Sequence, residues 1–239
     1  MSQLQRIVIS PSQLQDKQIS LTREQLHYLV RVLRSHNGDR FIAIDGTGKW
    51  WLTKLQGEFG TVLELLDVKT ELPVSINLLV ALPKGNGFDD VVRACTELGV
   101  ANIVPVLSDR TLLNPSQQKL ERWRRIAIEA TEQSERAIIP TILEPMSFKA
   151  ALSALTAEQK YICEGRGNNP HLLSYLQNQE KVTNNQIIIA IGSEGGWTDA
   201  ELELAIKTGY QPVSLGKRIL RAITAPTVAL SLISAVYEV

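Results

Sequence analysis

Apolar and polar positions follow two different patterns along this chain, and the pattern changes near residue 70. Before that point, short alternating segments are separated by turn residues such as Asn37-Gly38 and Asp45-Gly46, which is typical of turn-linked β-strands. Thr22 followed by Gln25 forms a capping-box motif and predicts one amphipathic helix that runs through Leu33. Strands are expected at residues 5–9, 40–44, 50–55 and 61–67. Residues 1–70 are therefore expected to form a small β-barrel domain.

From residue 73 onward, short apolar runs alternate with segments of helical periodicity, as happens when crossover helices cover a parallel sheet. The apolar runs predict strands at residues 76–82, 103–107, 161–164, 187–192 and 213–215. Apolar positions at helical spacing predict helices over residues 88–98, 120–131 and 200–206, and an apolar helix near the end of the chain. Residues 73–239 are therefore expected to form an α/β domain with a parallel sheet.

Composition narrows the class of protein without identifying a function. The chain has 239 residues, 44% of them hydrophobic, and 25 basic residues against 25 acidic ones, so no overall positive field indicates nucleic acid. No apolar run is long enough for a membrane span and the first residues do not resemble a secretory signal, so a cytoplasmic protein is expected. Cys95 and Cys163 lack a CxxC partner and the histidines are few, which predicts buried cysteines and no metal site.

The first candidate for chemistry is a glycine loop, Gly192-Ser193-Glu194-Gly195-Gly196, directly after an expected buried strand. Thr198 and Glu201 then form a capping box that opens a helix. Ligands bind outside the carboxyl ends of parallel strands, so the loop is expected to border a ligand site. It matches neither the Walker loop nor GxGxxG, and a flexible turn is the alternative interpretation.

A second loop follows the next expected strand. Leu215-Gly216 is followed by three cations, and Thr224 is expected to cap the last helix with Pro226 in its first turn. A solvated surface would explain the cations alone, but beside the first glycine loop they indicate a site for an anionic partner. A denser basic cluster lies around Trp123. It could belong to such a site, but an amphipathic helix with the tryptophan packed inward explains it equally well.

Five motifs in order along the chain resemble the RsmE family of SPOUT methyltransferases, enzymes that methylate N3 of a uridine in 16S ribosomal RNA. They are His27-Tyr28-Leu29-Val30-Arg31-Val32-Leu33-Arg34 with Gly38-Asp39, Lys84-Gly85 with Glu97-Leu98-Gly99-Val100, Glu132-Gln133-Ser134 with Arg136, Ile191-Gly192-Ser193-Glu194-Gly195-Gly196, and Leu215-Gly216-Lys217-Arg218-Ile219-Leu220-Arg221. Three positions depart from the pattern of many members. Ser193 replaces a proline, Glu135 replaces a glycine, and Ile223 replaces an acidic residue.

The resemblance implies a PUA-like N-terminal RNA-binding barrel, a SPOUT domain with a C-terminal trefoil knot, and a homodimer that acts in ribosome biogenesis. It also implies S-adenosylmethionine (SAM) as cofactor, in a site formed by Gly192, Glu194, Gly195, Gly196, Leu215, Gly216, Ile219 and Leu220. Arg221 is the first candidate for a catalytic cation and Arg136 the second, although a structural ion pair would explain Arg136 equally well. Contacts to the 16S RNA of the small ribosomal subunit are expected from Arg6, Arg31, Arg34, Arg40, Lys84 and Arg93. Arg31 and Arg34 are expected to share a helix face.

Three other functions stay open from the sequence. A SPOUT methyltransferase could act on another RNA, since the motifs describe the cofactor site better than the nucleotide. A non-catalytic RNA-binding factor for ribosome assembly would fit the missing acidic residue at Ile223. A nucleotide-binding protein is the third, and the missing Walker lysine weakens it.

Overall fold

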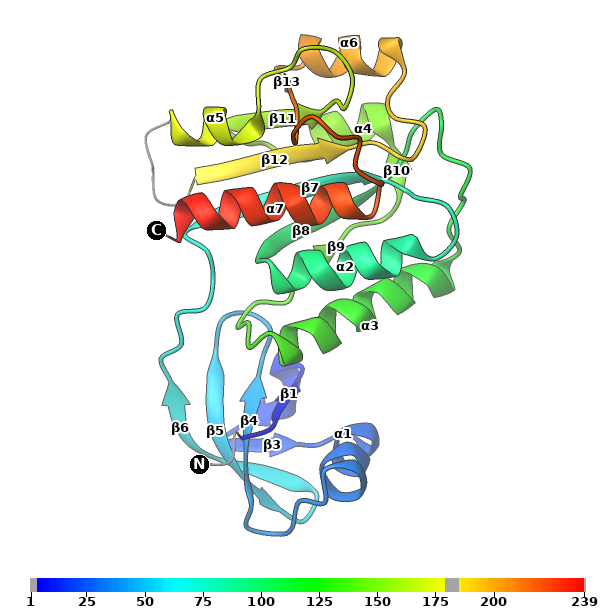
Figure 1. The fold of residues 1–239 in the computed structure, drawn as a ribbon. Coiled ribbons are helices and arrows are strands. Elements are labelled where there is room, and N and C mark those ends of the chain that lie inside the picture. Colours follow the sequence, from blue (N-terminus) through cyan, green and yellow to red (C-terminus); the bar gives the residue numbers. More distant parts are fainter. Residues whose placement is uncertain (1–3, 179–184, 239) are drawn as a thin grey trace. The chain divides into compact units, whose positions relative to one another are not determined.

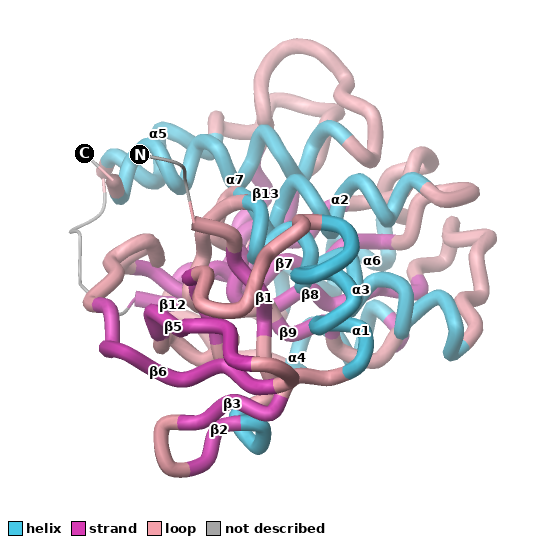
Figure 2. Tube along the Cα trace, turned by 90° about the horizontal axis from the view of Figure 1, so that it is seen from below, coloured by secondary structure: helices cyan, strands magenta, loops and turns pink. Residues whose placement is uncertain are grey.

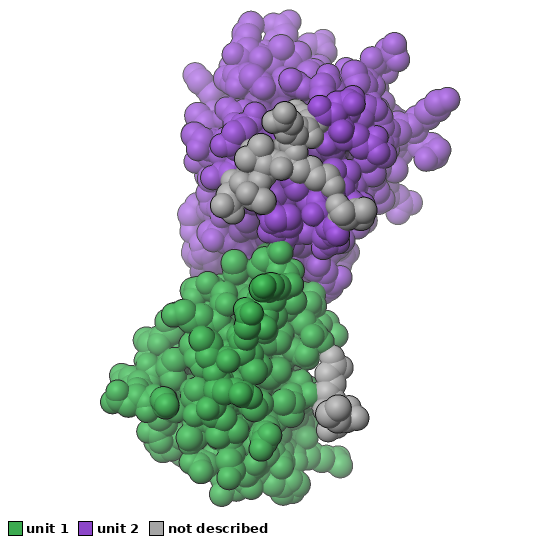
Figure 3. Space-filling model, turned by 90° about the vertical axis from the view of Figure 1, so that its left-hand side faces the viewer, with its two compact units in different colours: residues 1–71, 131–139 green, residues 72–130, 140–239 purple. Residues whose placement is uncertain are grey.

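The computed structural model describes residues 4–178 and 185–238, and the chain divides into two compact units. Unit 1 comprises residues 1–71 and 131–139, and unit 2 comprises residues 72–130 and 140–239 (Figure 3). The second segment of unit 1 is a finding that local sequence patterns did not predict. None of the described helices is long and apolar enough to cross a lipid bilayer.

Unit 1 is built on one six-stranded sheet in the order β1-β4-β5-β6-β3-β2. Its elements are β1 (Arg6–Val8), the 3-10 turn η1 (Pro11–Gln13), β2 (Leu14–Gln15), β3 (Gln18–Ser20), α1 (Arg23–His27), the π-helical turn η2 (Tyr28–Val32), β4 (Arg40–Ile44), β5 (Trp50–Gln56) and β6 (Phe59–Leu66). β1 pairs parallel with β4, and the other pairs are antiparallel. The expected small barrel is a half-barrel, because no ladder among the described residues joins the short edge strands β1 and β2.

The predicted helix of unit 1 begins as its capping box indicates. The Gln25 N–H donates to Thr22 Oγ1 at 3.2 Å, and the Thr22 N–H donates to Gln25 Oε1 at 2.8 Å. The helix then widens into a π-helical turn that ends at Val32, with Leu33 as its C-cap, and Arg34 has a left-handed φ of 57°. The prediction that Arg31 and Arg34 share a helix face is therefore wrong, since Arg34 lies beyond the helix.

The returning segment of unit 1 is fastened by a buried ion pair. The side chain of Arg136 is 4% exposed, and its Nη2 lies 2.6 Å from Glu71 Oε2. Glu71 Oε1 accepts the N–H groups of Ala137 and Ile138 at 2.9 and 3.1 Å. Ala137 packs in a small cluster with Ile42, Ile44 and Trp50. Glu71 thus ties the end of the first segment of unit 1 to the second.

Unit 2 contains a parallel sheet in the order β10-β8-β7-β12-β11-β13, with the short β9 also paired to β8 (Figure 1). The strands are β7 (Val74–Ala81), β8 (Val100–Leu107), β9 (Thr141–Ile142), β10 (Met146–Ser147), β11 (Gln159–Cys163), β12 (Asn185–Ile191) and β13 (Gln211–Val213). The helices are α2 (Gly87–Glu97), α3 (Gln117–Gln133), whose last three residues belong to unit 1, α4 (Phe148–Ala154), α5 (Leu172–Gln177), α6 (Asp199–Lys207) and α7 (Thr224–Tyr237). The predicted α/β architecture with a parallel sheet is confirmed.

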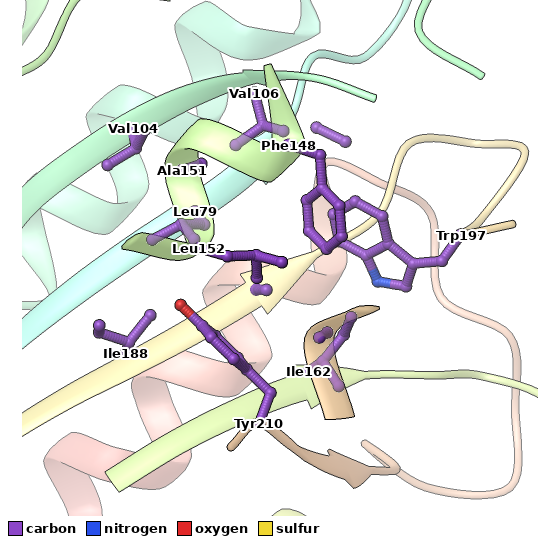
Figure 4. Packing of buried hydrophobic residues seen from close by; sticks show 13 residues of the cluster. Leu79, Val104, Val106, Phe148, Ala151, Leu152, Ile162, Ile188, Trp197 and Tyr210 are labelled. Atoms are coloured by element: carbon purple, nitrogen blue, oxygen red, sulfur yellow. The ribbon is translucent and has the colours of Figure 1, made fainter. Parts of the chain in front are cut away.

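Helices cover both faces of this sheet. α7 packs against α2, α5, β7 and β12, and it lies beside α2 in both views of the trace (Figures 1 and 2). On the opposite face, α4 and α6 cover a core that includes Leu79, Val104, Phe148 and Trp197 (Figure 4). Residues on β7 are buried on both faces, which explains why the strand is a continuous apolar run.

Two predictions about helices in unit 2 have different outcomes. Trp123 is 1% exposed and its indole N–H donates to Asp89 Oδ1 at 3.0 Å, so the basic cluster around it is the outer face of an amphipathic helix. Thr224, in contrast, is not the N-cap of the last helix. The cap is Ile223, which has helical φ and ψ and no capping side-chain hydrogen bond, and Pro226 lies in the first turn as predicted.

Candidate functional site

A cavity of about 570 Å³ lies in unit 2, at the carboxyl ends of β7, β11 and β12. Three loops form most of its wall: the loop after β11, the glycine loop after β12 and the loop after β13. All eight residues predicted to bind the cofactor line it, namely Gly192, Glu194, Gly195, Gly196, Leu215, Gly216, Ile219 and Leu220. The structure thus brings both predicted glycine loops to one site.

The glycine loop after β12 needs glycine at two positions for different reasons. Gly196 has a φ of 69°, in the left-handed region that side chains disfavour, and its N–H donates to the Ser193 carbonyl at 2.9 Å. A Cβ on Gly192 would lie 3.3 Å from the backbone of Gly196. A Cβ on Gly196 would meet no atom within 4 Å. The loop therefore folds tightly on itself and presents bare backbone on the cavity wall.

A neighbouring loop, after β8, braces this glycine loop from outside. Arg110 Nη1 donates to the carbonyls of Gly195 and Trp197, at 2.6 and 3.0 Å. Next to it, Thr198 Oγ1 donates to Asp109 Oδ2 at 3.1 Å, and Glu201 Oε1 accepts the Asp109 N–H at 2.9 Å. Sequence reasoning missed this brace, although the position of Arg110 after a parallel strand is a signal that could have found it.

The loop after β11 is the third wall, and it was also missed from the sequence. Its ends are tied to the last residue of β13 and to the residue that follows. The Glu164 N–H donates to the Val213 carbonyl and the Ser214 N–H donates to the Pro170 carbonyl, both at 2.9 Å. At the cavity, Ile219 Cδ1 lies 3.0 Å from where a Cβ on Gly165 would be. The two loops therefore form one continuous wall in which Ile219 is 71% exposed.

The charges around the cavity are mainly positive. Lys84, Arg166, Arg218 and Arg221 line it, together with Glu164 and Glu194. Each carboxylate already accepts a backbone N–H: Glu164 from Arg166 at 2.7 Å, and Glu194 from Lys84 at 3.1 Å. The four cations form no ion pair with any other described residue, and their side chains are exposed. The cavity can therefore receive a group that carries negative charge.

Neither cysteine is suited to nucleophilic chemistry. Cys95 is buried in the core as expected, whereas Cys163 lies on the cavity wall. Burial raises the pKa of both thiols, and the negative charge of Glu164 raises that of Cys163 further. Both therefore stay protonated near neutral pH and are weak nucleophiles. Among the residues that the structure describes, no group of three or more His, Cys, Asp or Glu side chains could hold a metal ion.

The remaining predicted residues lie outside this cavity wall. Arg136 is paired with Glu71 in unit 1, and Arg6, also in unit 1, lies 2.8 Å from Glu135 and 5.5 Å from the centre of the Trp50 ring. Arg93 pairs with Asp90 on α2 at 3.3 Å. Arg31, Arg34 and Arg40 lie in unit 1 and are exposed. Glu135 has a φ of 61°, in the left-handed region that favours glycine.

Comparison with known proteins adds to this geometry. A family model described as an RNA methyltransferase domain matches residues 70–234, and one described as an RNA methyltransferase PUA domain matches residues 21–62. A ribosomal RNA small subunit methyltransferase E of Synechocystis is 48% identical over 98% of this chain and 78% of its own length. Two solved structures with bound SAM cover 98% of both chains. One is a ribosomal RNA small subunit methyltransferase E from Neisseria gonorrhoeae (28% identity, TM-score 0.88), and the other is a methyltransferase from Legionella pneumophila (27%, 0.86).

Proposed function

Because this chain belongs to the ribosomal RNA small subunit methyltransferase E family, we propose that it transfers the methyl group of SAM to N3 of a uridine in 16S ribosomal RNA. The observation that carries the proposal is the cavity itself, in which two glycine loops meet at the carboxyl ends of parallel strands. The SAM-bound relatives from Neisseria and Legionella support the choice of cofactor.

The cavity fits SAM in size and in chemistry. Its volume, about 570 Å³, lies in the range of small-molecule sites. Apolar side chains of Leu215, Ile219 and Leu220 can enclose an adenine ring, and the bare backbone at Gly196 allows a ligand to approach closely. Gly192, Glu194, Gly195 and Gly216 complete the proposed cofactor site.

The chain's own residues then position and stabilise the uridine. When bound, SAM supplies a methyl group on a positively charged sulfur. Transfer is an in-line displacement, so the loops must hold N3 close to that methyl group and aligned with it. N3 carries a proton at neutral pH, and loss of this proton to solvent places negative charge on the ring. The bond from N3 to the methyl carbon then forms as the bond from that carbon to sulfur breaks, which leaves a neutral thioether. Arg221 lines the cavity and has no ion-pair partner among the described residues, so its guanidinium is free to stabilise that charge.

Further parts of the proposal concern the whole protein. Unit 2 carries the reaction and ends in a trefoil knot, unit 1 is a PUA-like RNA-binding domain, and the protein acts as a homodimer in the cytoplasm. Arg31, Arg34 and Arg40 on unit 1, and Lys84 on the cavity, bind RNA phosphates, because their side chains are exposed and form no ion pair with another described residue. Two further assignments stay predictions: that Arg6 and Arg93 contact RNA, and that Arg136 has a catalytic role.

The function is tested by mapping modified nucleotides of 16S RNA by mass spectrometry in cells with and without this protein. N3-methyluridine that is present in the first and missing in the second supports the proposal. A methylated base that persists without the protein contradicts it, and a missing methyl group on another RNA favours the alternative of a different RNA target.

The role of Arg221 is tested separately with the purified protein. We expect Arg221→Ala to lose methyl transfer while it keeps its fold and its calorimetric affinity for SAM. A variant that methylates ribosomal RNA at the parent rate contradicts the assignment. If the parent itself binds SAM and RNA but transfers no methyl group, the non-catalytic assembly factor is the better reading of the chain.

A further inference from the structure

We propose that Arg166 and Arg218 form a phosphate clamp at the mouth of the cavity, which grips the RNA backbone next to the target nucleotide. This inference rests on the proposed function, and it assigns the nucleic-acid contact to loops of unit 2. Both arginines line the cavity and are exposed, and neither forms an ion pair with another described residue.

The two arginines come from different loops, but those loops meet beside them. Ile219, which follows Arg218, lies against Gly165, which precedes Arg166. The bridge between His171 and Ser214 and the Leu172 N–H bond to the Ser214 carbonyl, at 2.9 Å, join the same two loops further back. The arginines therefore project from one joined wall, and this wall can hold them at a fixed spacing.

The backbone around Arg166 is itself fixed. Its N–H donates to Glu164 Oε1 at 2.7 Å, and its carbonyl accepts the Asn169 side-chain amide at 3.0 Å. The Arg218 guanidinium lies over Gly216, with Nη2 4.0 Å from where a Cβ would be. The backbone contacts thus fix the base of the Arg166 side chain, the guanidinium of Arg218 lies beside Gly216, and both residues are exposed to solvent.

The charge balance indicates that the clamp serves RNA. SAM carries a net positive charge and has one carboxylate, whereas the cavity is lined by four cations against the two carboxylates of Glu164 and Glu194. The SAM carboxylate needs only one of these cations, and a nearby excess of positive charge would weaken the binding of a cation. RNA supplies the missing negative charge, because consecutive phosphates can pair with two arginines that project from one wall of the cavity.

The test measures the salt dependence of binding between the full-length protein and 16S ribosomal RNA, for the parent, Arg166→Ala, Arg218→Ala and the double variant. We expect each substitution to reduce the slope of log affinity against log salt concentration by about 0.7 to 0.9, the value of one phosphate contact. Arg124→Ala is the matched control, because Arg124 is an arginine of unit 2 that already pairs with Glu121 and Glu144. Its slope should equal that of the parent.

Calorimetric titration with SAM provides the second measurement. We expect the affinity for SAM not to fall in either clamp variant. A lower SAM affinity with an unchanged salt slope overturns the clamp and assigns the arginines to the cofactor carboxylate. An unchanged slope with unchanged SAM affinity overturns it as well. A parent that neither binds SAM nor transfers a methyl group refutes the proposed function instead, while a reduced slope in the variants would still support a phosphate clamp.

Discussion

The ion pair between Glu71 and Arg136 gives the most quantitative prediction for this protein. Glu71→Gln removes the negative charge beside a guanidinium that is 4% exposed, while the shape of the side chain is kept. Removing one partner of a buried ion pair costs about 3 to 5 kcal/mol, because the other charge is left uncompensated. The Glu71 side chain is 23% exposed, so water can solvate part of the uncompensated charge and reduce this cost. We therefore expect a loss of about 2 to 4 kcal/mol in the stability of unit 1.

Urea unfolding measures this loss, with tryptophan fluorescence reporting on unit 1 through Trp50 and Trp51. With a urea dependence of about 2 kcal/mol per molar, in the middle of the usual range, the midpoint should fall by roughly 1 to 2 M. Arg93→Ala is the control, because its ion pair with Asp90 is exposed and should change stability by less than about 0.5 kcal/mol. A midpoint for Glu71→Gln that matches the control would refute the reasoning.

The same pair separates the two roles open to Arg136. Arg136→Ala removes the ion pair and the candidate catalytic cation together, whereas Glu71→Gln leaves the arginine in place. Both variants are compared at a temperature at which both are folded. If Arg136 takes part in the reaction, Arg136→Ala should have a much lower turnover than Glu71→Gln. Equal turnover in the two variants would assign Arg136 to structure alone.

Three further predictions concern the cofactor loop and the core. Gly196→Val should abolish calorimetric SAM binding, since a branched side chain must adopt a φ of 69° on the cavity wall, and an unchanged affinity contradicts this. Arg110→Ala should weaken SAM binding about tenfold, the equivalent of one charge-assisted hydrogen bond to the loop, and equal affinities in parent and variant would exclude the brace. Burial raises the pKa of Tyr161 and Tyr210 to about 12, so the folded state keeps protons that the unfolded state loses above pH 10, and stability should fall between about pH 10 and pH 12. In Tyr210→Phe this fall in stability should be smaller than in the parent. An identical pH dependence in the two proteins would contradict the assignment of the fall to Tyr210.

Strongly local features of the fold could be predicted from the sequence. The strand at Arg40–Ile44 matches its predicted bounds, and the capping boxes at Thr22 and Thr198 form as their motifs indicate. In each case the signal lies within a few neighbouring residues. The short strands β2 and β3 were missed because their residues are mostly polar. Thr224 failed as a cap because the turn before it is already helical and places it inside the helix.

Long-range features could not be predicted in the same way. Nothing in the local pattern around residues 131–139 indicates that this segment packs with the N-terminal strands, because Glu71 and Arg136 meet only after folding. The two glycine loops were found because each follows a strand of the sheet. The wall formed by Cys163–Arg166 and the brace at Arg110 also follow strands, but neither lies in one of the five family motifs, so both were found only through their contacts with those loops.

A crystal structure of this protein grown with SAM tests the central claim most directly. The account predicts the cofactor inside the cavity of unit 2, between the loops at Gly192–Gly196 and Leu215–Leu220, with its methyl group directed toward the space beside Arg221. Electron density for SAM at any other place on the chain, with this cavity empty, would contradict it.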